Sequence, residues 1–327
     1  MICSVRFDTH RKFAGYLIIL RNEEKGMSKK KKQQALIRSV PFMLPSFVGM
    51  IIFSLLPIVI SVFISLTDWN GLDKLNLDTL SQHFVGLKNY TSILTTSEFW
   101  KVLGHTLYYI VLYIPLVFLA SLGIAVILNK NMKGITAFRV MYYIPVLTSW
   151  VAASLIWKWV LSPQYGIFNQ LLSYIGIKGP SWLTSEVWAM PAIVLASVWK
   201  DMGFFGLFLL SGLKMIDTTY YEAARVDGAG KVKQFFSITL PLLTPSIFFC
   251  MIMSLINAFQ LFPQVMIMTE GGPNGATQVM VERIYTYGFK YFKMGYASAY
   301  SWLLFVIIFV LTVIQMKGQK GWVHYES

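Results

Sequence analysis

The amino-acid sequence predicts an all-α integral membrane protein with six transmembrane helices. Apolar residues make up 56% of the 327 residues and charged residues only 13%, about half the charged fraction of a soluble domain. The net charge of +13 is not gathered in a patch, because the basic residues fall in the segments between long apolar runs. This distribution is typical of membrane proteins and argues against a soluble or nucleic-acid-binding chain.

Six apolar runs each have about the length that crosses the hydrocarbon core of a bilayer. They cover residues 40–66, 107–128, 140–160, 190–213, 242–268 and 297–316. Several contain proline, which membrane helices tolerate because neighbouring helices satisfy the freed backbone groups. Residues 40–316 are therefore expected to form one transmembrane domain, followed by a tail at residues 317–327.

Residues 1–39 form a segment ahead of the first run. Residues 13–20 are apolar but too few to span a bilayer, and no small-residue cleavage site of a signal peptide follows them. Met27, followed by Ser28 and four lysines, is typical of a protein start. We therefore expect the native chain to begin at Met27, with an ordered amphipathic leader at residues 1–26 as the alternative.

The distribution of Lys and Arg predicts the orientation in the membrane. Fourteen of them lie in the leading segment from Met27, the second–third and fourth–fifth connections and the tail, against eight in the remaining connections, which are longer. Because short cytoplasmic segments carry the excess of basic residues, both termini and the fourth–fifth connection are predicted to be cytoplasmic. Residues 68–106 and 271–275 are predicted to face outward.

The connection between the fourth and fifth runs, at about residues 214–241, is predicted to be helical without being a span. Helix formers around Glu222 are followed by the small residues 228–230, which break the helix. Apolar residues at helical spacing then predict a second short helix that ends at Pro241. Two short helices joined by a small-residue elbow indicate a knob that contacts a partner, although an ordinary interhelical loop is the alternative.

Polar residues inside the spans are candidates for a solute pathway. Lys200 and Asp201 fall near the middle of the fourth run, where charge is costly and usually faces a cavity or a partner. The aromatic residues Trp199 and Phe204 lie beside them and suit sugar rings. We favour a pathway, and the alternative is a mutually neutralised structural pair packed against another helix.

A polar stripe runs along the fifth run, where Ser254, Asn257 and Gln260 recur at steps of three. This spacing places the three side chains on one face of a helix. They either line the pathway or make interhelical hydrogen bonds, which are common in membranes. Asn257 is the strongest candidate for a substrate contact.

The sequence contains no signature of an enzyme. It has no phosphate-binding loop of the P-loop type, so it has no such site for ATP. The four histidines are scattered without metal-ligand spacing. We predict no catalytic residue, metal site or cofactor in this chain.

The fourth–fifth connection also carries a family motif, EAARVDGA at residues 222–229 followed by FSITLP at residues 236–241. This segment resembles the EAA signature of binding-protein-dependent ABC importer permeases. The similarity covers about residues 40–315 and includes DW at 68–69, FVGLKNY at 84–90 and GGP at 271–273. These features resemble the carbohydrate-uptake subgroup, of the maltose and glycerol-3-phosphate type.

The resemblance implies the type I ABC importer permease fold, in a bacterial cytoplasmic (inner) membrane. It implies that the knob is a coupling helix that docks in a cleft of a cytoplasmic ATPase subunit. The coupling residues would be Glu222, Ala223, Ala224, Asp227 and Gly228. The implied partners are a second homologous permease, two ATPase subunits that bind ATP and Mg, and an extracytoplasmic solute-binding protein.

The resemblance also places sugar-contacting positions in the two spans that flank the knob. Matched through residues 222–223 and 271–273, they are Lys200, Asp201, Phe204, Ser254, Asn257 and Ala258. With the polar stripe included, the predicted substrate-binding residues are Lys200, Asp201, Phe204, Ser254, Asn257 and Gln260. Ala258 stands where the maltose member has a polar residue, which argues against maltose itself.

The sequence thus predicts one half of the membrane channel of an ATP-driven sugar importer. A neutral oligosaccharide ranks ahead of glycerol-3-phosphate, which would require more cationic charge than Lys200 beside Asp201 provides. An ion-coupled secondary transporter is the rival, and it would show an ion site and an internal repeat. A membrane anchor for an enzyme complex is a third interpretation, which the mid-membrane charges disfavour.

Overall fold

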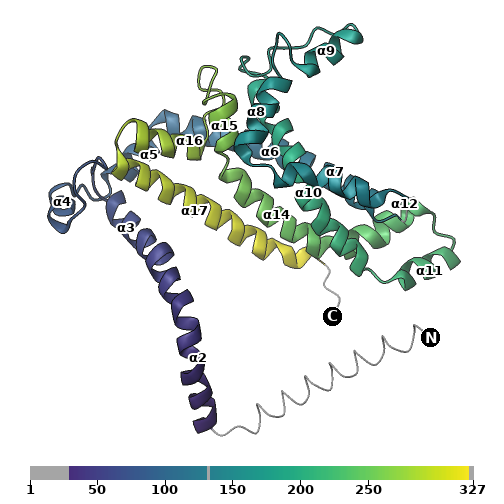
Figure 1. Cartoon of the computed structure of the whole chain (residues 1–327), viewed down its shortest axis with the longest axis horizontal. Coiled ribbons are helices and arrows are strands. Elements are labelled where there is room, and N and C mark those ends of the chain that lie inside the picture. Colours follow the sequence, from purple (N-terminus) through teal and green to yellow (C-terminus); the bar gives the residue numbers. More distant parts are fainter. Residues whose placement is uncertain (1–28, 131–132, 324–327) are drawn as a thin grey trace. The chain divides into compact units, whose positions relative to one another are not determined.

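The computed structural model describes residues 29–130 and 133–323, and its regular elements in these ranges are all helices (Figure 1). The expectation for residues 1–26 lies outside the described residues. The chain divides into two compact units, Met1–Ser61 and Val62–Ser327.

The first unit contains α2 (Lys29–Met50), the π-helical turn η1 (Ile51–Leu55) and the beginning of α3 (Leu56–Ser65). Pro57 has no backbone N–H to donate to Phe53, and the wider turn η1 lies where this hydrogen bond is missing. Residues Val40–Ser65 form one apolar helical stretch of span length, with side chains that are largely exposed. Such a surface fits lipid, as the first predicted span requires.

The second unit is built around α10 (Ala189–Met215), which packs along α6 (Ser97–Leu128). In the most apolar stretch of α10, 61% of the residues are buried, which is the highest share among the four long spans. Small residues allow this packing: a Cβ on Gly212 would lie 2.3 Å from Ser246 Oγ of the neighbouring α14 (Thr244–Phe259). Close approach at small residues is the usual way for membrane helices to associate.

The third predicted span, residues 140–160, is not one straight helix. It divides into α7 (Ile135–Leu147) and α8 (Trp150–Val160), which meet at an angle of 101°. Thr148 and Ser149 have extended backbones, and the Ser149 side chain accepts a hydrogen bond from the Ala152 N–H to start α8. The local N-cap therefore replaces helix continuation at this point.

The fifth predicted span, residues 242–268, is also interrupted. The helix α14 ends at Phe259, and a separate short helix, α15, covers Pro263–Met268. Proline disfavours a helical conformation in the residue before it, and Phe262 is indeed non-helical. Before α14, the elements α12 (Lys231–Gln234), η2 (Phe235–Thr239) and α13 (Leu240–Leu242) form a helical stretch bent by 63° from it.

The remaining helices of this unit are one further candidate span, α17, and several short helices. They are α4 (Leu77–Gln82), α5 (Lys88–Thr95), α9 (Ile167–Tyr174), α11 (Thr218–Val226), α16 (Met280–Tyr285), η3 (Thr286–Lys290), α17 (Met294–Gly318) and η4 (Gln319–Gly321). Among the described residues, four helices are long and apolar enough to span a membrane, and six spans result if each bent pair counts as one. This agrees with the six spans that the sequence predicts.

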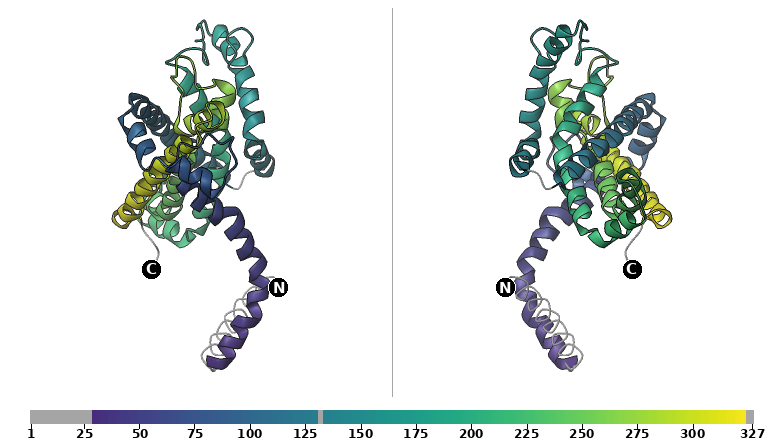
Figure 2. Two further views of the ribbon diagram at one scale, coloured as in Figure 1. Left: turned by 90° about the vertical axis from the view of Figure 1, so that its left-hand side faces the viewer. Right: turned by 90° about the vertical axis from the view of Figure 1, so that its right-hand side faces the viewer.

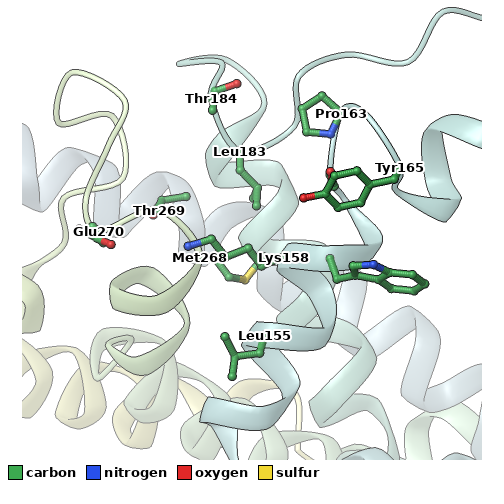
Figure 3. Close-up of a pocket in the computed structure, with 11 residues that line it drawn as sticks. Leu155, Lys158, Pro163, Tyr165, Leu183, Thr184, Met268, Thr269 and Glu270 are labelled. Carbon is green, nitrogen blue, oxygen red and sulfur yellow. The ribbon is translucent and has the colours of Figure 1, made fainter.

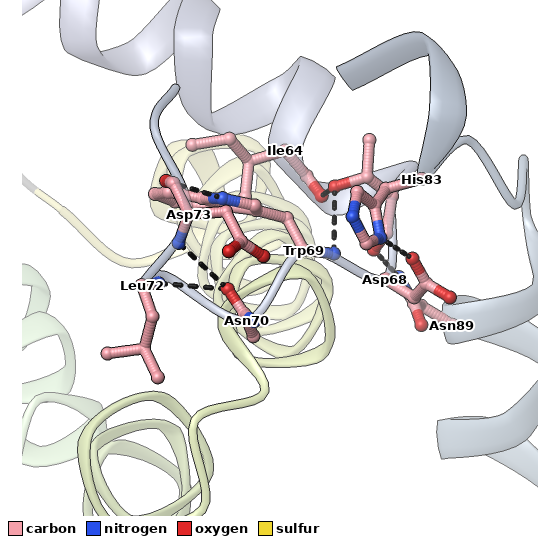
Figure 4. A network of polar contacts seen from close by, with 9 residues as sticks. Ile64, Asp68, Trp69, Asn70, Leu72, Asp73, His83 and Asn89 are labelled. Atoms are coloured by element: carbon pink, nitrogen blue, oxygen red, sulfur yellow. Dashed lines mark hydrogen bonds and ion pairs between the residues drawn. The ribbon is translucent and has the colours of Figure 1, made fainter. Parts of the chain in front are cut away.

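The segment after α3 is fixed by a network of polar contacts (Figure 4). The Asn89 side chain donates to the carbonyls of Ser65 and Thr67, at 2.9 and 2.7 Å, and Asp68 contacts His83 at 2.7 Å. The chain also passes close to α17, because a Cβ on Gly295 would lie 1.8 Å from the Thr67 carbonyl oxygen. The residues 68–69 and 84–90 thus hold this turn against α17.

The helix α10 separates two functional ends of the second unit. Its 27 residues extend over about 40 Å, with α9 before its first residue and α11 after its last. In Figures 1 and 2, α9 and α11 accordingly lie at opposite ends of the helical bundle. The Asp201 position, near the middle of α10, lies between these ends.

Candidate substrate pathway and coupling segment

Lys200 and Asp201 leave α10 in different directions, because successive residues of a helix are about 100° apart. The Lys200 ammonium donates hydrogen bonds to the carbonyls of Pro145 and Val146, at 3.1 and 3.3 Å. It lies 5.1 Å from the ring centroid of Trp150, and the side chain is only 6% exposed. A cation at these carbonyls adds to the bonds that Thr148 donates to Pro145 and stabilises the C-terminal end of α7.

The close approach of α7 and α10 makes this contact available. A Cβ on Gly203 would lie 2.8 Å from the Tyr142 carbonyl oxygen, so a larger residue would separate the helices. Lys200 therefore fastens α7 to α10 at the bend before α8. The hydrogen bonds of Lys200 thus go to another helix, and its contact with a substrate stays a prediction.

Asp201 instead faces α6. The Tyr113 hydroxyl donates a hydrogen bond of 2.7 Å to Asp201 Oδ2, and the Tyr113 ring stacks on Tyr109 at 5.2 Å between centroids. These side chains border a cavity of about 250 Å³. Its lining residues are Tyr109, Tyr113, Trp150, Asp201, Asn257, Ala258, Gln260, Pro263 and Gln264.

The cavity brings together three of the six predicted substrate-binding residues, namely Asp201, Asn257 and Gln260. Asn257 and Gln260 are exposed, and Gln260 is the C-cap residue directly after α14. The chain breaks between α14 and α15, and this break lets Asn257 and Gln260 lie beside Asp201. In one continuous helix, the polar side chains would be spread along its length.

The other three predicted residues do not line this cavity. Ser254 is fully buried, and its hydroxyl donates to the Met251 carbonyl of its own helix at 3.0 Å. Phe204 packs against Phe205 and Phe208, with ring centroids 5.3 and 4.9 Å apart. Together with Lys200, these residues contact protein groups in the described structure.

Five lining residues were not predicted from the sequence: Tyr109, Tyr113, Trp150, Pro263 and Gln264. Tyr109 and Tyr113 are four residues apart inside a span, and this spacing of hydroxyl-bearing side chains on one helical face was the available signal. Gln264 is 5% exposed, and its Oε1 atom has no hydrogen-bond partner. Gln264 follows Pro263, the first residue of α15. The sequence predicted one continuous span through these residues.

A second, wider hollow of about 600 Å³ lies between the end of α8 and the segment after α15 (Figure 3). Its polar groups include Lys158, Thr184 and Glu270. The Lys158 ammonium donates to the Ile267 carbonyl at 3.2 Å and so joins α8 to α15. This hollow belongs to the α9 end of the second unit.

The predicted coupling segment begins with a well-formed helix start. The Asp217 carboxylate accepts hydrogen bonds from the backbone N–H and the hydroxyl of Thr219, at 2.9 and 2.7 Å. These bonds hold the pKa of Asp217 below its usual value, the backbone bond contributing most. The carboxylate therefore caps the first turn of α11.

The elbow of this segment is a Schellman turn. Ala229 N–H donates to the Ala224 carbonyl at 2.8 Å and Gly228 N–H to the Arg225 carbonyl at 3.1 Å. Gly228 has φ of +73°, a conformation that glycine adopts without the steric cost of a side chain. The structure thus has two helical pieces on either side of Gly228, in the arrangement that the residue pattern predicts.

Two side-chain hydrogen bonds join the helical pieces of the coupling segment to one another. The Tyr221 hydroxyl bonds Thr239 Oγ1 at 3.0 Å, and the Gln234 amide donates to the Ala229 carbonyl at 2.7 Å. Glu222 and Ala223 are exposed on the opposite side. Large apolar side chains are also exposed here, namely Met215, Val226, Val232 and Phe236. Exposed apolar groups beside charged ones are typical of a protein-binding surface.

The described residues contain no group of three or more His, Cys, Asp or Glu side chains that could hold a metal ion. The binding of ATP and Mg by partner subunits stays a prediction.

Comparison with known proteins identifies the family. Residues 91–317 match the family described as binding-protein-dependent transport system inner membrane component. The chain belongs to this family. It is 38% identical over 291 residues to the probable ABC transporter permease YesP of Bacillus subtilis (strain 168), covering 88% of this chain and 91% of YesP.

Another relative of this permease is the trehalose/maltose transport system permease MalF of Thermococcus litoralis. The two are 34% identical over 278 residues, which cover 84% of this chain and 90% of MalF. Among solved structures, the permease resembles a chain of a bacterial ABC transporter involved in the import of the acidic polysaccharide alginate. The TM-score is 0.75 at 22% identity, covering 89% of this chain and 97% of that one.

These matches confirm the predicted family and the ABC importer permease fold. They also confirm a multi-pass membrane protein that acts as a component of a transport system. The individual substrate-contact and coupling residues stay predictions that rest on the geometry described above.

Proposed function

We propose that this permease forms one half of the translocation pathway of an ATP-driven sugar importer. A second, homologous permease would complete the pathway, and two cytoplasmic ATPase subunits would drive it. An extracytoplasmic solute-binding protein would deliver the sugar at the α9 end of the second unit. The family description and the sugar-related relative support this proposal.

The single observation that carries the proposal is the exposed coupling segment at one end of α10. It presents Glu222 and Ala223 beside exposed apolar side chains. Ala223 borders a surface hollow of about 440 Å³ with Asp217, Thr219 and Tyr220. A small residue in a hollow permits close approach by a partner, and Glu222 offers a charge for a basic partner group.

The mechanism follows from the position of this segment. ATP binding would close the ATPase subunits and move the segment, which is covalently continuous with both α10 and α14. These two helices carry Asp201, Asn257 and Gln260 on the cavity. Rigid-body motion would thus switch the cavity between inward and outward opening, driven by a difference in partner affinity between the two states.

The orientation follows the distribution of basic residues, with both termini and the coupling segment in the cytoplasm of a bacterial cell. The cavity carries aromatic rings together with amide and carboxylate groups, a combination that suits sugars. We propose a neutral oligosaccharide as the substrate class.

The test is recovery of the intact complex from native membranes through a tag on this chain. We expect an ATPase subunit and a second permease to be recovered together with it, and labelled sugar uptake to require ATP. Recovery of the chain without an ATPase, with uptake that follows an ion gradient, would instead establish a secondary transporter.

A further inference from the structure

We propose that residues 289–293 bind the phosphate group of an anionic phospholipid in the leaflet at the start of α17. This aromatic–lysine segment, FKYFK in sequence, connects η3 to α17 and combines three aromatic residues with two lysines. The lysine ammonium groups would bind the lipid phosphate, and the rings would enter the layer between headgroups and acyl chains. The inference depends neither on the sugar nor on the ATPase.

The first support is the exposure of the aromatic–lysine segment. All five of its side chains are exposed, whereas Gly288 before it is buried and Met294 after it is half-buried. The three rings, of Phe289, Tyr291 and Phe292, are each at least 50% exposed. Contiguous exposed rings on a folded surface indicate contact with another molecule or with lipid.

The second support is the charge of the segment. Residues 283–325 contain no Asp or Glu, so no acidic residue nearby in the sequence neutralises Lys290 and Lys293. Among the described residues, neither lysine takes part in an ion pair. Two unpaired ammonium groups three positions apart favour an anionic ligand, and lysine is a common phosphate binder.

The combination of residue types favours lipid over a protein partner. Aromatic residues are enriched both in protein–protein interfaces and in the belts at membrane surfaces, but lysine is depleted in protein–protein interfaces. Near the end of a span, lysine instead extends its ammonium group to the headgroups while its methylene chain covers apolar surface. The aromatic–lysine segment lies directly before a candidate span, where this second arrangement applies.

The length of α17 places the segment at the headgroup layer. Lys317, in the last turn of α17, marks the opposite membrane surface. Counting back from Lys317, about 20 residues at about 1.5 Å each cross a hydrocarbon core of ~30 Å and reach Ala297. Lys293 lies one helical turn further, or about 6 Å, and a headgroup layer is about 5–8 Å thick. Lys293 therefore lies at the level of the lipid phosphates.

The bundle fixes the backbone of the segment. The Lys293 N–H donates to the Tyr287 carbonyl at 2.9 Å, and the Tyr291 N–H donates to the Thr286 carbonyl at 3.0 Å. The Tyr287 hydroxyl in turn donates to the carboxylate of Glu98, in the first turn of α6. A backbone that is already ordered loses less conformational entropy when a ligand binds, which strengthens binding.

The experiment identifies the lipid in contact with the segment. Bimane is attached to Tyr291→Cys in a Cys3→Ser background, in the full-length chain with its co-purified subunits, and the native Cys250 is buried. The nanodiscs contain equal amounts of phosphatidylglycerol and phosphatidylcholine. Only one of the two lipids carries brominated acyl chains, which quench bimane on contact and report lipid rather than soluble phosphate. We expect phosphatidylglycerol to be preferred about 25-fold, from about fivefold for each lysine.

Three double variants decide whether the lysines cause this preference. Lys290→Gln with Lys293→Gln should reduce the preference about 25-fold, so that the two lipids bind almost equally. Lys130→Gln with Lys133→Gln removes the same charge at the same spacing beyond the other end of α6, and should leave the preference unchanged. Lys290→Arg with Lys293→Arg keeps the charge and should keep the preference.

Equal quenching by the two brominated lipids, or an equal loss of preference in the two Gln variants, would overturn the inference. The absence of quenching by either lipid would overturn it as well, and soluble iodide then identifies the surroundings of the segment. Quenching by iodide would place the segment in water, whereas protection from iodide would assign it to a protein partner.

Discussion

The cavity around Asp201 and the coupling segment around Glu222 depart from their surroundings in opposite ways. The cavity places polar groups inside an apolar bundle, whereas the coupling segment exposes apolar side chains on a polar surface. Each arrangement costs free energy in the isolated chain and is relieved by contact with another molecule. The comparison indicates a ligand for the first region and a protein partner for the second.

The two regions also differ in how they are held. Asp201 borders a cavity whose lining comes from α6, α8, α10, α14 and α15, and Lys200 ties α10 to α7 beside it. In the coupling segment, the side-chain hydrogen bonds of Tyr221 and Gln234 join residues within the segment itself. We infer that the cavity is positioned by the bundle and that the coupling segment gains its final position from the ATPase.

The largest expected effect is on coupling. Glu222→Lys reverses the exposed charge that we assign to the ATPase contact, so sugar uptake should fall at least about tenfold while ATPase activity persists. Uptake and ATP hydrolysis are measured in the same proteoliposomes. Asp78→Lys, an equal reversal on the exposed helix α4, is the control. Normal uptake by Glu222→Lys would show that this residue does not serve the docking.

Lys200→Met tests whether Lys200 belongs to the bundle rather than to the ligand. The substitution removes the donor to the Val146 carbonyl, while the Pro145 carbonyl keeps its bonds from Thr148, and the free energy of unfolding should fall by about 2 kcal/mol. Thermal unfolding in detergent measures the loss. The ratio of glucose to glucuronate binding should not change, and a changed ratio with unaltered stability would assign Lys200 to the cavity instead.

Gly228→Ala tests the elbow of the coupling segment. A Cβ at this position meets no atom within 4 Å, so the effect comes from the backbone at φ of +73° alone. The cost is about 1 kcal/mol, equivalent to roughly fivefold weaker binding of the ATPase. Gly230→Ala is the matched control, because Gly230 is equally open but has φ of −68°. Equal binding of the ATPase by both variants would show that the elbow does not contribute to docking.

The smallest effect is expected from Ser254→Ala. The Ser254 hydroxyl is satisfied by its own helix, so stability and uptake should change little, within about 0.5 kcal/mol. Asn257→Ala, three residues along, should reduce sugar binding because Asn257 lines the cavity. Equal losses of sugar binding in both variants would restore the continuous polar stripe as the binding surface.

Local patterns were sufficient to predict the coupling segment. The break at Gly228 depends on residues within a few positions, and the Schellman turn follows from glycine after helix formers. The helical membrane fold was predictable for the same reason, since span length and composition are properties of continuous stretches.

The lining of the cavity could not be predicted from spacing, because it forms through contacts between residues that are far apart in the sequence. Tyr113 meets Asp201 across 88 positions, and Lys200 meets Pro145 across 55. The stripe through Ser254 assumed a continuous helix, but α14 ends at Phe259 and changes which polar groups face the cavity. Asp201 borders the cavity, whereas its neighbour Lys200 bonds the end of another helix.

The most direct test joins the two regions in one measurement. Gln260→Cys in a Cys3→Ser background places a thiol at the cavity, and the native Cys250 is buried. In the complete transporter in nanodiscs, ATP with vanadate should change the labelling rate of this thiol by a charged maleimide at least about tenfold. Adding Glu222→Lys should abolish the change, because a two-state shift requires the partner to favour one state. A rate that responds to ATP equally with and without Glu222→Lys would contradict the account.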